Sequence, residues 1–337
     1  MRRTDNIGGI PAFHREPMDI SLDSLLAVAE RTWYIGIDGG GTKTEFVLCD
    51  DRGAVHDRIV AEGSNPNSLG LEKSYDVLCA GLDRLLDGRR VQQVFGGISG
   101  VTVGDFRTRL TNRLTERYHT PVAVHTDAVN LLACARNGEI SGAVICGTGS
   151  CVFVREHGNL HRFGGWGYLF DEAGSAYHIG RDAVRHALMV GDGFAPPDLL
   201  YRRMAQALGG NPFGQLKHVY EQGSAAIASF ARIVTDAAQQ GDPSALAILE
   251  RNAGYIAKLL CAATGRYGGD IEFIADGGLM RHEPFRRMIS QRTGVALRLQ
   301  ELPPVFGACI EALRLSGTEP TDAWRNHFRD TYRRHTC

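Results

Sequence analysis

The chain has 337 residues, of which 43% are hydrophobic and 22% are charged, and its formal net charge is −1. This length is too great for one ordinary core and suits two domains. Proteins that bind nucleic acids or anionic membranes usually carry an excess of basic residues, and this chain has none. No apolar run reaches the roughly 18 residues of a transmembrane helix. We therefore expect no nucleic-acid partner and no membrane partner.

The first 32 residues are expected to be an N-terminal extension. They hold two early arginines but no apolar stretch before acidic residues, so we expect no signal peptide. Asp19 or Ser21 would cap a short amphipathic helix over 19–31. The 8 cysteines form no CxxC pair and mostly lie in apolar stretches, which favours buried or free thiols in a reducing compartment. These observations predict a cytoplasmic protein.

The ordered core is predicted to begin at Trp33. A buried strand at 33–37 leads into the glycine turn DGGGTKT, and two further strands follow at 45–50 and about 54–61. Leucines and a tyrosine on one face predict a helix over 71–87. The pattern then predicts a strand at 94–100, a helix at 104–118, a strand at 122–126 and a helix at 128–136.

A second unit opens at residue 142 with the same order of strand, glycine turn and strand, the turn here being CGTGSC. This repetition predicts a duplicated fold in which each half presents one glycine hairpin. Residues 175–262 are mostly helical in pattern. The remaining elements are predicted as a strand at 270–279 that leads to a third glycine turn, a helix at 283–292, a strand at 295–301 and a helix at 303–315.

The glycine turns are suited to holding phosphate. The first differs from a P-loop because Thr42 stands before Lys43, and from a dinucleotide fingerprint because a strand follows the turn. Amides at a glycine hairpin tip can wrap phosphate oxygens as an anion nest, and Asp38 can hold Mg²⁺ directly or through water. The second turn offers the same donors, and the third, at 275–279, offers a flat floor for adenosine. A plain structural turn is the alternative for each.

Five segments in order and spacing resemble the N-acetylglucosamine kinase group of the BadF/BadG/BcrA/BcrD ATPase family, within the sugar kinase/actin-like superfamily. They are WYIGIDGGGTKTEFVLCD, HTDAVN, CGTGS, GGWGYLFDEAGSAYHIGRDA and ADGGL. The resemblance covers about residues 33–315. It implies an α/β, two-domain actin-like ATPase (ribonuclease H-like) fold with an interdomain cleft. Domain I would comprise 33–137 plus about 306–325, and domain II would comprise 138–305.

The resemblance also implies an ATP-dependent kinase that uses Mg²⁺, acts as a homodimer and phosphorylates the 6-hydroxyl of N-acetylglucosamine or a related amino sugar. Asp38 would be the metal ligand. The implied ATP-binding residues are Asp38, Gly39, Gly40, Gly41, Thr42, Lys43 and Thr44 in the first phosphate element, Gly147, Thr148, Gly149 and Ser150 in the second, and Gly277 and Gly278 against adenosine.

Asp127 is the candidate catalytic base, because it follows an apolar strand at a point where an aspartate can face a cleft. Phosphoryl transfer to a sugar hydroxyl needs a carboxylate within hydrogen-bond reach of that hydroxyl. The alternative is that Asp127 only N-caps the helix at 128–136. The resemblance favours catalysis, because kinases of this group carry their base in a TDA segment at a strand end.

The implied sugar-binding residues are Asn67, Gly165, Trp166, Asp171 and Glu172. Amide side chains suit sugar hydroxyls, and an aromatic face can stack on a sugar ring, although a turn and a core tryptophan are the alternatives. The group usually reads GDEGS after the tryptophan. Here Glu172 takes the usual aspartate position and Asp171 stands where glycine is common, so either carboxylate could hold the hydroxyls.

Two other functions fit the same fold. One is an ATPase that activates a radical dehydratase, which would need cysteines for an iron–sulfur cluster that bridges a dimer. The other is a non-catalytic sugar-responsive regulator, for which residues 1–32 are too short to form a DNA-binding helix-turn-helix. Among kinases, glucosamine, N-acetylmuramic acid and glucose are the rival substrates.

Overall fold

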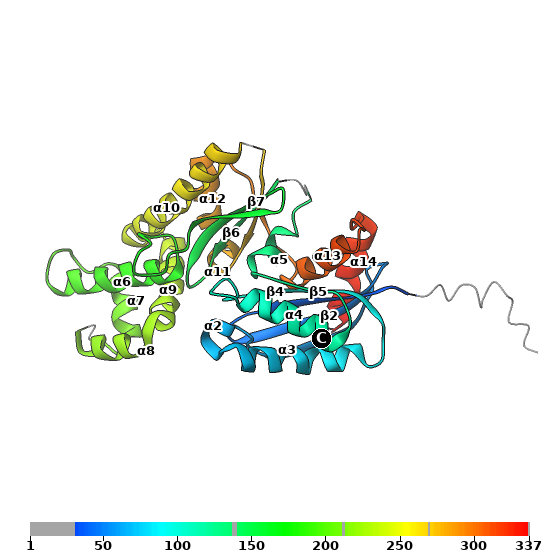
Figure 1. The fold of residues 1–337 in the computed structure, drawn as a ribbon. Coiled ribbons are helices and arrows are strands. Elements are labelled where there is room, and N and C mark those ends of the chain that lie inside the picture. The colour runs from blue at the N-terminus through cyan, green and yellow to red at the C-terminus, as the bar shows by residue number, and fades with distance from the viewer. Residues whose placement is uncertain (1–30, 137–139, 211–212, 269, 336–337) are drawn as a thin grey trace, which may run out of the picture.

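The computed structural model describes residues 31–136, 140–210, 213–268 and 270–335. The helix expected at 19–31 lies outside these ranges, apart from its last residue. Among the described residues, no helix is both long and apolar enough to cross a membrane. Figure 1 shows two lobes, one built on the early strands with the C-terminal helices beside them and one built on the middle of the chain.

Each lobe contains a five-stranded sheet, and the two sheets have the same topology. The first has the order β3-β2-β1-β4-β5, and the second has the order β10-β9-β6-β7-β8. In each sheet the three strands that come first along the chain are antiparallel neighbours (β1, β2 and β3, or β6, β7 and β8). The remaining two strands add in parallel beside the first of these three. The strands are β1 (Trp33–Gly39), β2 (Lys43–Asp50), β3 (Val55–Glu62), β4 (Val91–Ile98), β5 (Val122–His125), β6 (Ile140–Cys146), β7 (Ser150–Glu156), β8 (Asn159–Gly164), β9 (Glu272–Asp276) and β10 (Leu297–Leu299).

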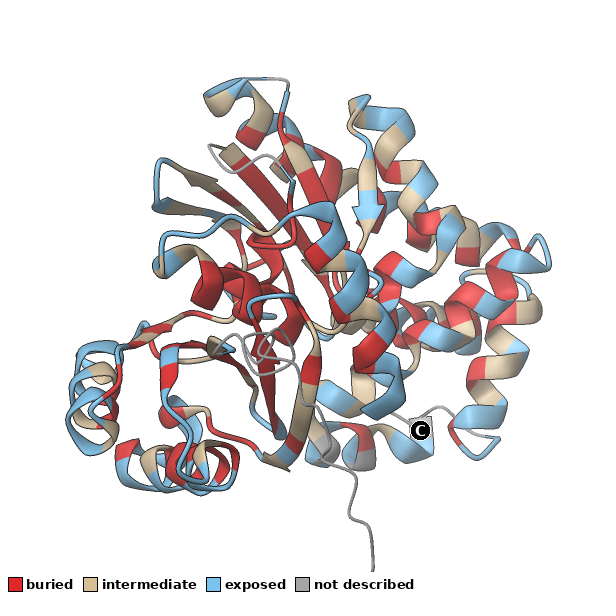
Figure 2. Ribbon diagram, turned by 90° about the vertical axis from the view of Figure 1, so that its right-hand side faces the viewer, coloured by how far each residue is buried: buried red, intermediate tan, exposed pale blue. Residues whose placement is uncertain are grey.

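The predicted duplication is therefore confirmed. The β1–β2 and β6–β7 connections are the two glycine turns, at equivalent places in the two sheets. Strand β8 was not predicted, because most of its residues are polar or only partly buried and show no clear alternation. Buried residues concentrate in the strands and on the helix faces that cover them (Figure 2).

Helices cover both faces of the first sheet. Ile35 and Ile37 belong to the core cluster that α3 (Leu71–Leu86) and α4 (Phe106–Tyr118) complete, whereas Tyr34 joins the opposite core. That opposite core includes α5 (Ala128–Leu132), α13 (Val305–Leu315) and α14 (Asp322–Tyr332). Helix α5 also contacts β6, β7 and β9, so it lies at the junction between the lobes. It is shorter than the predicted 128–136.

Helices of the second lobe pack around its sheet in one large core. They are α6 (Ala176–Gly191), α7 (Leu199–Ala207), α8 (Leu216–Ser229), α9 (Ala231–Gln239), α10 (Pro243–Tyr267), α11 (Gly278–Arg281) and α12 (Glu283–Thr293). Short helical segments complete the fold at α2 (Pro66–Leu69), η1 (Phe213–Gln215) and η2 (Arg333–His335).

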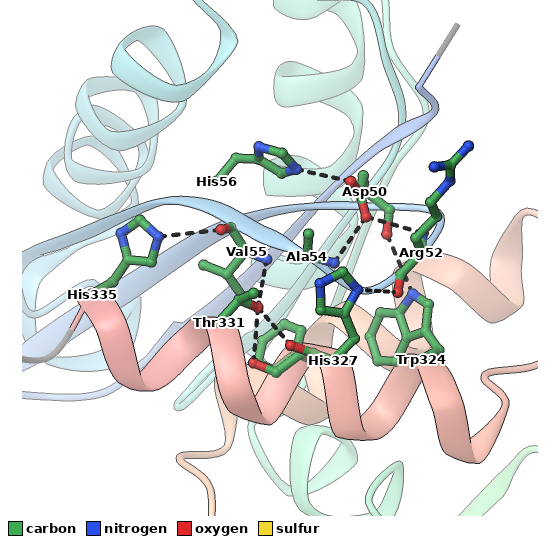
Figure 3. A network of polar contacts seen from close by, with 10 residues as sticks. Asp50, Arg52, Ala54, Val55, His56, Trp324, His327, Thr331 and His335 are labelled. Atoms are coloured by element: carbon green, nitrogen blue, oxygen red, sulfur yellow. Dashed lines mark hydrogen bonds and ion pairs between the residues drawn. The ribbon is translucent and has the colours of Figure 1, made fainter. Parts of the chain in front are cut away.

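Helix α14 was also not predicted, and it docks on the β2–β3 hairpin (Figure 3). Val55 donates its N–H to Thr331 Oγ1, and its carbonyl lies 3.2 Å from His335 Nε2. Trp324 Nε1 donates to the Asp50 carbonyl at 3.3 Å, and the Asp50 carboxylate accepts from the turn amides and contacts His56. These contacts satisfy backbone groups at the start of the edge strand β3.

Candidate active site

Helix α5 begins at Asp127, which the sequence identifies as the candidate base. Its Oδ1 accepts hydrogen bonds from the Ala128 N–H at 2.9 Å and from Thr126 Oγ1 at 3.0 Å. The capping interaction offered as the alternative role is thus present. All these side-chain hydrogen bonds fall on Oδ1, and the residue also lines a hollow. One carboxylate can therefore start the helix and still present its second oxygen to a ligand.

The same helix places Asn130 beside the end of β1. Asn130 Nδ2 donates to Asp38 Oδ1 at 2.8 Å. Asp127, the base candidate, and Asn130, which contacts the metal-ligand candidate Asp38, are therefore about one helical turn apart at the start of α5. Gly97 makes room for this amide, because a Cβ there would lie 2.2 Å from Asn130 Oδ1. The sequence analysis did not select Asn130, although it stands in the HTDAVN segment.

The two aspartates have elevated proton affinities. Burial raises the pKa of Asp38 to about 7, and the charges of Asp127 and Glu45 also raise it. The hydrogen bond from Asn130 and the charge of Lys43 lower this pKa but do not offset the burial. Burial also raises the pKa of Asp127, against the hydrogen bonds from Thr126 and Ala128. Desolvation disfavours a bare carboxylate, so this pair of acidic groups suits a site that receives a cation or a proton.

Asp127 faces a hollow of about 370 Å³, which we call the Asp127 hollow. A second hollow of about 600 Å³ is bordered by Gly278 and by small residues of α8 and α9, and we call it the Gly278 hollow. Gly147 and Thr148 of the second glycine turn line both. The Asp127 hollow is lined by Asp127, Ile145, Gly147, Thr148, Gly149, Ser150, Cys151, Phe153, Gly165, Gly167, Tyr168, Asp171, Ser175 and His178.

The second glycine turn is held from two sides. Its carbonyls at Gly147 and Thr148 accept the N–H groups of Ala176 and Tyr177, at 2.8 Å and 3.3 Å, in the first turn of α6. Gly277 lies against the neighbouring strand end with a φ of 103°, and a Cβ there would be 2.3 Å from the Cys146 carbonyl oxygen. Glycine is therefore required where the third turn meets the second.

The first glycine turn closes on itself and on two loops of its own lobe. The Gly40 N–H donates to the Lys43 carbonyl at 2.9 Å, and the Gly40 carbonyl accepts from Ser64 at 3.0 Å. The side chains of Thr42 and Lys43 are exposed, whereas Thr44 is fully buried. Residues Gly39 to Thr44 line neither hollow.

The five predicted sugar residues have different positions. Asp171 is 5% exposed, lines the Asp127 hollow with Gly165, and accepts from the Gly167 N–H and the Tyr255 hydroxyl, each at 3.1 Å. The Glu172 side chain is 64% exposed and lies 3.9 Å from Lys258 Nζ, outside the hollow.

The other two residues, Trp166 and Asn67, are also outside the lining. Trp166 is 61% exposed, and the Arg162 guanidinium lies 4.2 Å from its ring centroid. Asn67 is exposed, and its backbone N–H donates to Asn65 Oδ1 at 2.8 Å. The structure thus gathers Asp127, Asp171 and Gly165 around one space and leaves Trp166, Glu172 and Asn67 at the surface.

Two matching sheets, each with a glycine hairpin between its first strands, define the actin-like two-domain ATPase fold. The chain belongs to the BadF/BadG/BcrA/BcrD ATPase family, whose sequence model matches residues 35–312. The family predicted from the sequence motifs is thereby confirmed, and membership of an ATPase family implies the use of ATP.

Two relatives with assigned names are similar in sequence. An N-acetyl-D-glucosamine kinase of Dictyostelium discoideum is 33% identical over 192 residues, which cover 52% of this chain and 60% of the relative. An N-acetylmuramic acid/N-acetylglucosamine kinase of Clostridium acetobutylicum is 30% identical over 234 residues, which cover 66% of this chain and 76% of the relative. The match to the Dictyostelium protein therefore leaves about two fifths of that protein unaligned.

Solved structures share the fold. A Chromobacterium violaceum protein, provisionally assigned as an N-acetylglucosamine kinase, superposes with a TM-score of 0.66 at 23% identity over 82% of this chain and 98% of its own. A ROK family glucokinase of Streptomyces griseus, in complex with glucose and AMPPNP, gives a TM-score of 0.56 at 19% identity over 84% and 99% of the two chains.

Proposed function

We propose that this protein is an ATP-dependent sugar kinase that phosphorylates the 6-hydroxyl of N-acetylglucosamine or a closely related amino sugar. The observation that carries the proposal is the position of Asp127. Its half-buried carboxyl group lines a hollow whose wall, at Gly147 and Thr148, is shared with a second, larger hollow. The names of the two sequence relatives support an amino sugar as the acceptor.

In this proposal the Gly278 hollow receives adenosine and the Asp127 hollow receives the sugar. The terminal phosphate of ATP would then lie at the shared wall, where the amides of Gly147 to Ser150 can donate to its oxygens. The exposed Thr42 and Lys43 of the first glycine turn would approach the same phosphates from the other lobe. Domain I would comprise 33–137 with about 306–325, and domain II would comprise 138–305.

Asp38 fits the metal role assigned to it. It is a largely buried carboxylate near a second acidic group, its Oδ1 is held by Asn130, and carboxylate oxygen is a ligand that Mg²⁺ prefers. When bound, Mg²⁺ would neutralise charge on the phosphate oxygens. Asn130 would keep the Asp38 carboxylate oriented toward the phosphates.

Asp127 would accept the proton of the attacking sugar hydroxyl. Burial raises its proton affinity, which brings a carboxylate closer to the pKa of an effective base at neutral pH. Asp171 would hold neighbouring hydroxyls, since its carboxylate borders the same hollow and is itself positioned by Gly167 and Tyr255. Glu172, which lies outside the hollow, is assigned no contact with the sugar ring.

The dehydratase-activator alternative is less well supported. Cys151 borders the Asp127 hollow, but burial raises the pKa of its thiol to about 12, which disfavours the thiolate that a cluster needs. The seven described cysteines are all free, which fits a reducing compartment, and we include a cytoplasmic location in the proposal. A homodimer is also part of the proposal, and light scattering of the purified protein tests it.

The decisive experiment is an ADP-release assay with N-acetylglucosamine, glucosamine, N-acetylmuramic acid and glucose. We expect sugar-dependent ADP formation that is fastest with an amino sugar, and mass spectrometry should find the phosphate on the 6-hydroxyl. Equal background rates with all four sugars would contradict the kinase assignment. Tight sugar binding without phosphorylation would instead favour the sugar-responsive regulator.

A further inference from the structure

Helix α5, which carries Asp127 at its start, is too short to hold its own direction. It has five residues, Ala128–Leu132, whereas isolated helices shorter than about 12 residues are marginal in water. Its last carbonyl groups also lack partners within the helix, as they do at any helix end. The orientation of Asp127 therefore depends on what holds the chain where α5 ends, at the junction of the two lobes (Figure 1).

Two charged side chains of the second lobe hold the segment that follows α5. The Cys134 carbonyl accepts from Arg298 Nη2 at 2.8 Å, and the Arg136 N–H donates to Glu272 Oε2 at 2.7 Å. Arg298 Nε also donates to Glu272 Oε1 at 2.6 Å, so the two side chains hold each other in place. We call Glu272 and Arg298 the α5 clamp.

The second sheet presents both clamp residues on the face that turns toward α5. Strands β9 and β10 pair in parallel, with Arg298 opposite Ile274. Glu272 precedes Ile274 by two positions, so the alternation of strand side chains puts it on the same face. Ile274 packs in the core cluster that contains Leu131 of α5. The clamp thus belongs to the contact surface between the lobes.

The contacts of the clamp are charge-assisted. Burial alone would raise the pKa of Glu272, but hydrogen bonds from the Arg136 N–H and from Arg298, with the charges of both arginines, lower it below the ordinary value of 4.5. Hydrogen bonds to ionised groups are roughly twice as strong as neutral ones. The planar guanidinium of Arg298 reaches a carboxylate and a carbonyl at once, which fixes their relative positions.

The clamp lies away from the spaces proposed for the ligands. Neither Glu272 nor Arg298 lines the Asp127 hollow or the Gly278 hollow. Seven residues separate Asp127 from Cys134, which is about 10 Å along a helix. A displacement of about 1 Å in a reacting group can lower a rate by about 100-fold. A contact at the end of α5 can therefore affect the chemistry at its start without touching a ligand.

We infer that Glu272 and Arg298 are positioning residues that hold the end of α5 and, through this helix, place the carboxylate of Asp127 for proton transfer. The inference rests on the sugar kinase function proposed above. It extends the site to a pair of residues from the other lobe.

The test begins with variants of the clamp. Arg298→Met removes both guanidinium contacts, and Arg298→Lys keeps the charge but lacks the planar fork that reaches two acceptors. Arg113→Met is the matched control, because Arg113 makes a 2.8 Å ion pair with Glu72 that joins α4 to α3. Steady-state assays with ATP and N-acetylglucosamine give kcat and both KM values.

We expect Arg298→Met to lower kcat about tenfold and to leave both KM values within about twofold, because the base is displaced while both hollows stay intact. Arg298→Lys should recover part of the lost kcat, and Arg113→Met should match the wild type. An effect confined to KM would contradict a role in placing the base.

A double-mutant cycle decides whether Arg298 acts through Asp127. In a protein that already carries Asp127→Asn, adding Arg298→Met should lower kcat by less than about twofold, because no base remains to be placed. Two losses that multiply would show that Arg298 acts independently of Asp127 and would overturn the inference.

Hydrogen exchange of residues 127–136 tests the clamp without any need for activity. We expect exchange to be about tenfold faster in Arg298→Met and unchanged in Arg113→Met, because a charge-assisted contact that limits local opening is lost. Glu272→Gln, which keeps an acceptor for the Arg136 N–H, should give a smaller change in the same direction and serves if Arg298→Met does not fold. Exchange equal to that of the wild type in the folded clamp variants would refute the clamp. If the wild type phosphorylates no sugar, the proposed function fails instead, and the exchange rates still decide whether the clamp holds α5.

Discussion

Replacing Asp127 can separate its two roles, because asparagine and alanine differ in what they retain. Asparagine keeps a side-chain oxygen that can accept the Ala128 N–H, now 2.9 Å from Asp127 Oδ1, and asparagine is as good an N-cap as aspartate. Alanine loses both the cap and the carboxylate. Neither variant can accept a proton from a hydroxyl at neutral pH, so both should lose the proposed chemistry.

The expected magnitudes follow from these contacts. A positioned general base contributes about 10²- to 10⁴-fold to rate, so kcat should fall by about that factor in both Asp127→Asn and Asp127→Ala. Loss of the cap should cost Asp127→Ala about 0.5–2 kcal/mol of unfolding free energy, whereas Asp127→Asn should stay within a few tenths of wild type. Coupled ADP release gives kcat, and urea unfolding gives the stability.

A fluorescent ATP analogue provides the control, since both variants should still bind nucleotide at the glycine turns. Near-wild-type turnover by Asp127→Asn would refute the assignment of Asp127 as base, even if Asp127→Ala were inactive. That pattern would mean that the aspartate serves only to start α5. Loss of activity in both variants with stability lost in alanine alone is the outcome that the geometry requires.

The remaining predictions concern neighbouring groups. Asp171→Asn should raise the KM for sugar by about tenfold, because one charged hydrogen bond is weakened, whereas the matched Glu172→Gln should leave that KM unchanged. Gly277→Ala should lower the unfolding free energy by about 1–3 kcal/mol and raise the KM for ATP, because a Cβ would overlap the Cys146 carbonyl, and equal stability in urea would contradict this. In a pH–rate profile, kcat/KM should fall as pH decreases through the raised pKa of Asp127, so the acidic limb should lie above the ordinary aspartate value of 3.8, and a limb at or below 3.8 would exclude a raised pKa.

The sequence predicted those parts of the fold whose pattern is local. The strand, glycine turn and strand over residues 33–50 recur over 140–156 because apolar strands bounded by glycines leave a clear signal. The missed elements lack that signal. Strand β8 has mostly partly buried residues, and α14 is a polar helix whose buried residues, such as Trp324 and Phe328, acquire meaning only where it docks.

The candidate site residues were reached in a different way. The residues alone left Asp127 open between a helix cap and a base, and the resemblance of its TDA segment to the kinase group decided for the base; Asp171 came from the segment after Trp166 that the same group carries. Asn130 could not be selected in this way, because its contact with Asp38 spans 92 positions of sequence and exists only in the folded chain.

The segment at Gly147 and Thr148 borders two spaces and is tied by its carbonyls to the start of α6. If the two hollows bind nucleotide and sugar as proposed, a nucleotide that shifts this backbone would also move the start of α6, and a sugar that orders α6 would pull on the same peptide groups. By linkage, any change that the nucleotide then makes in the free energy of sugar binding would be matched by an equal change that the sugar makes in the free energy of nucleotide binding. Such coupling would favour ATP binding when a sugar is present and so limit hydrolysis of ATP by water.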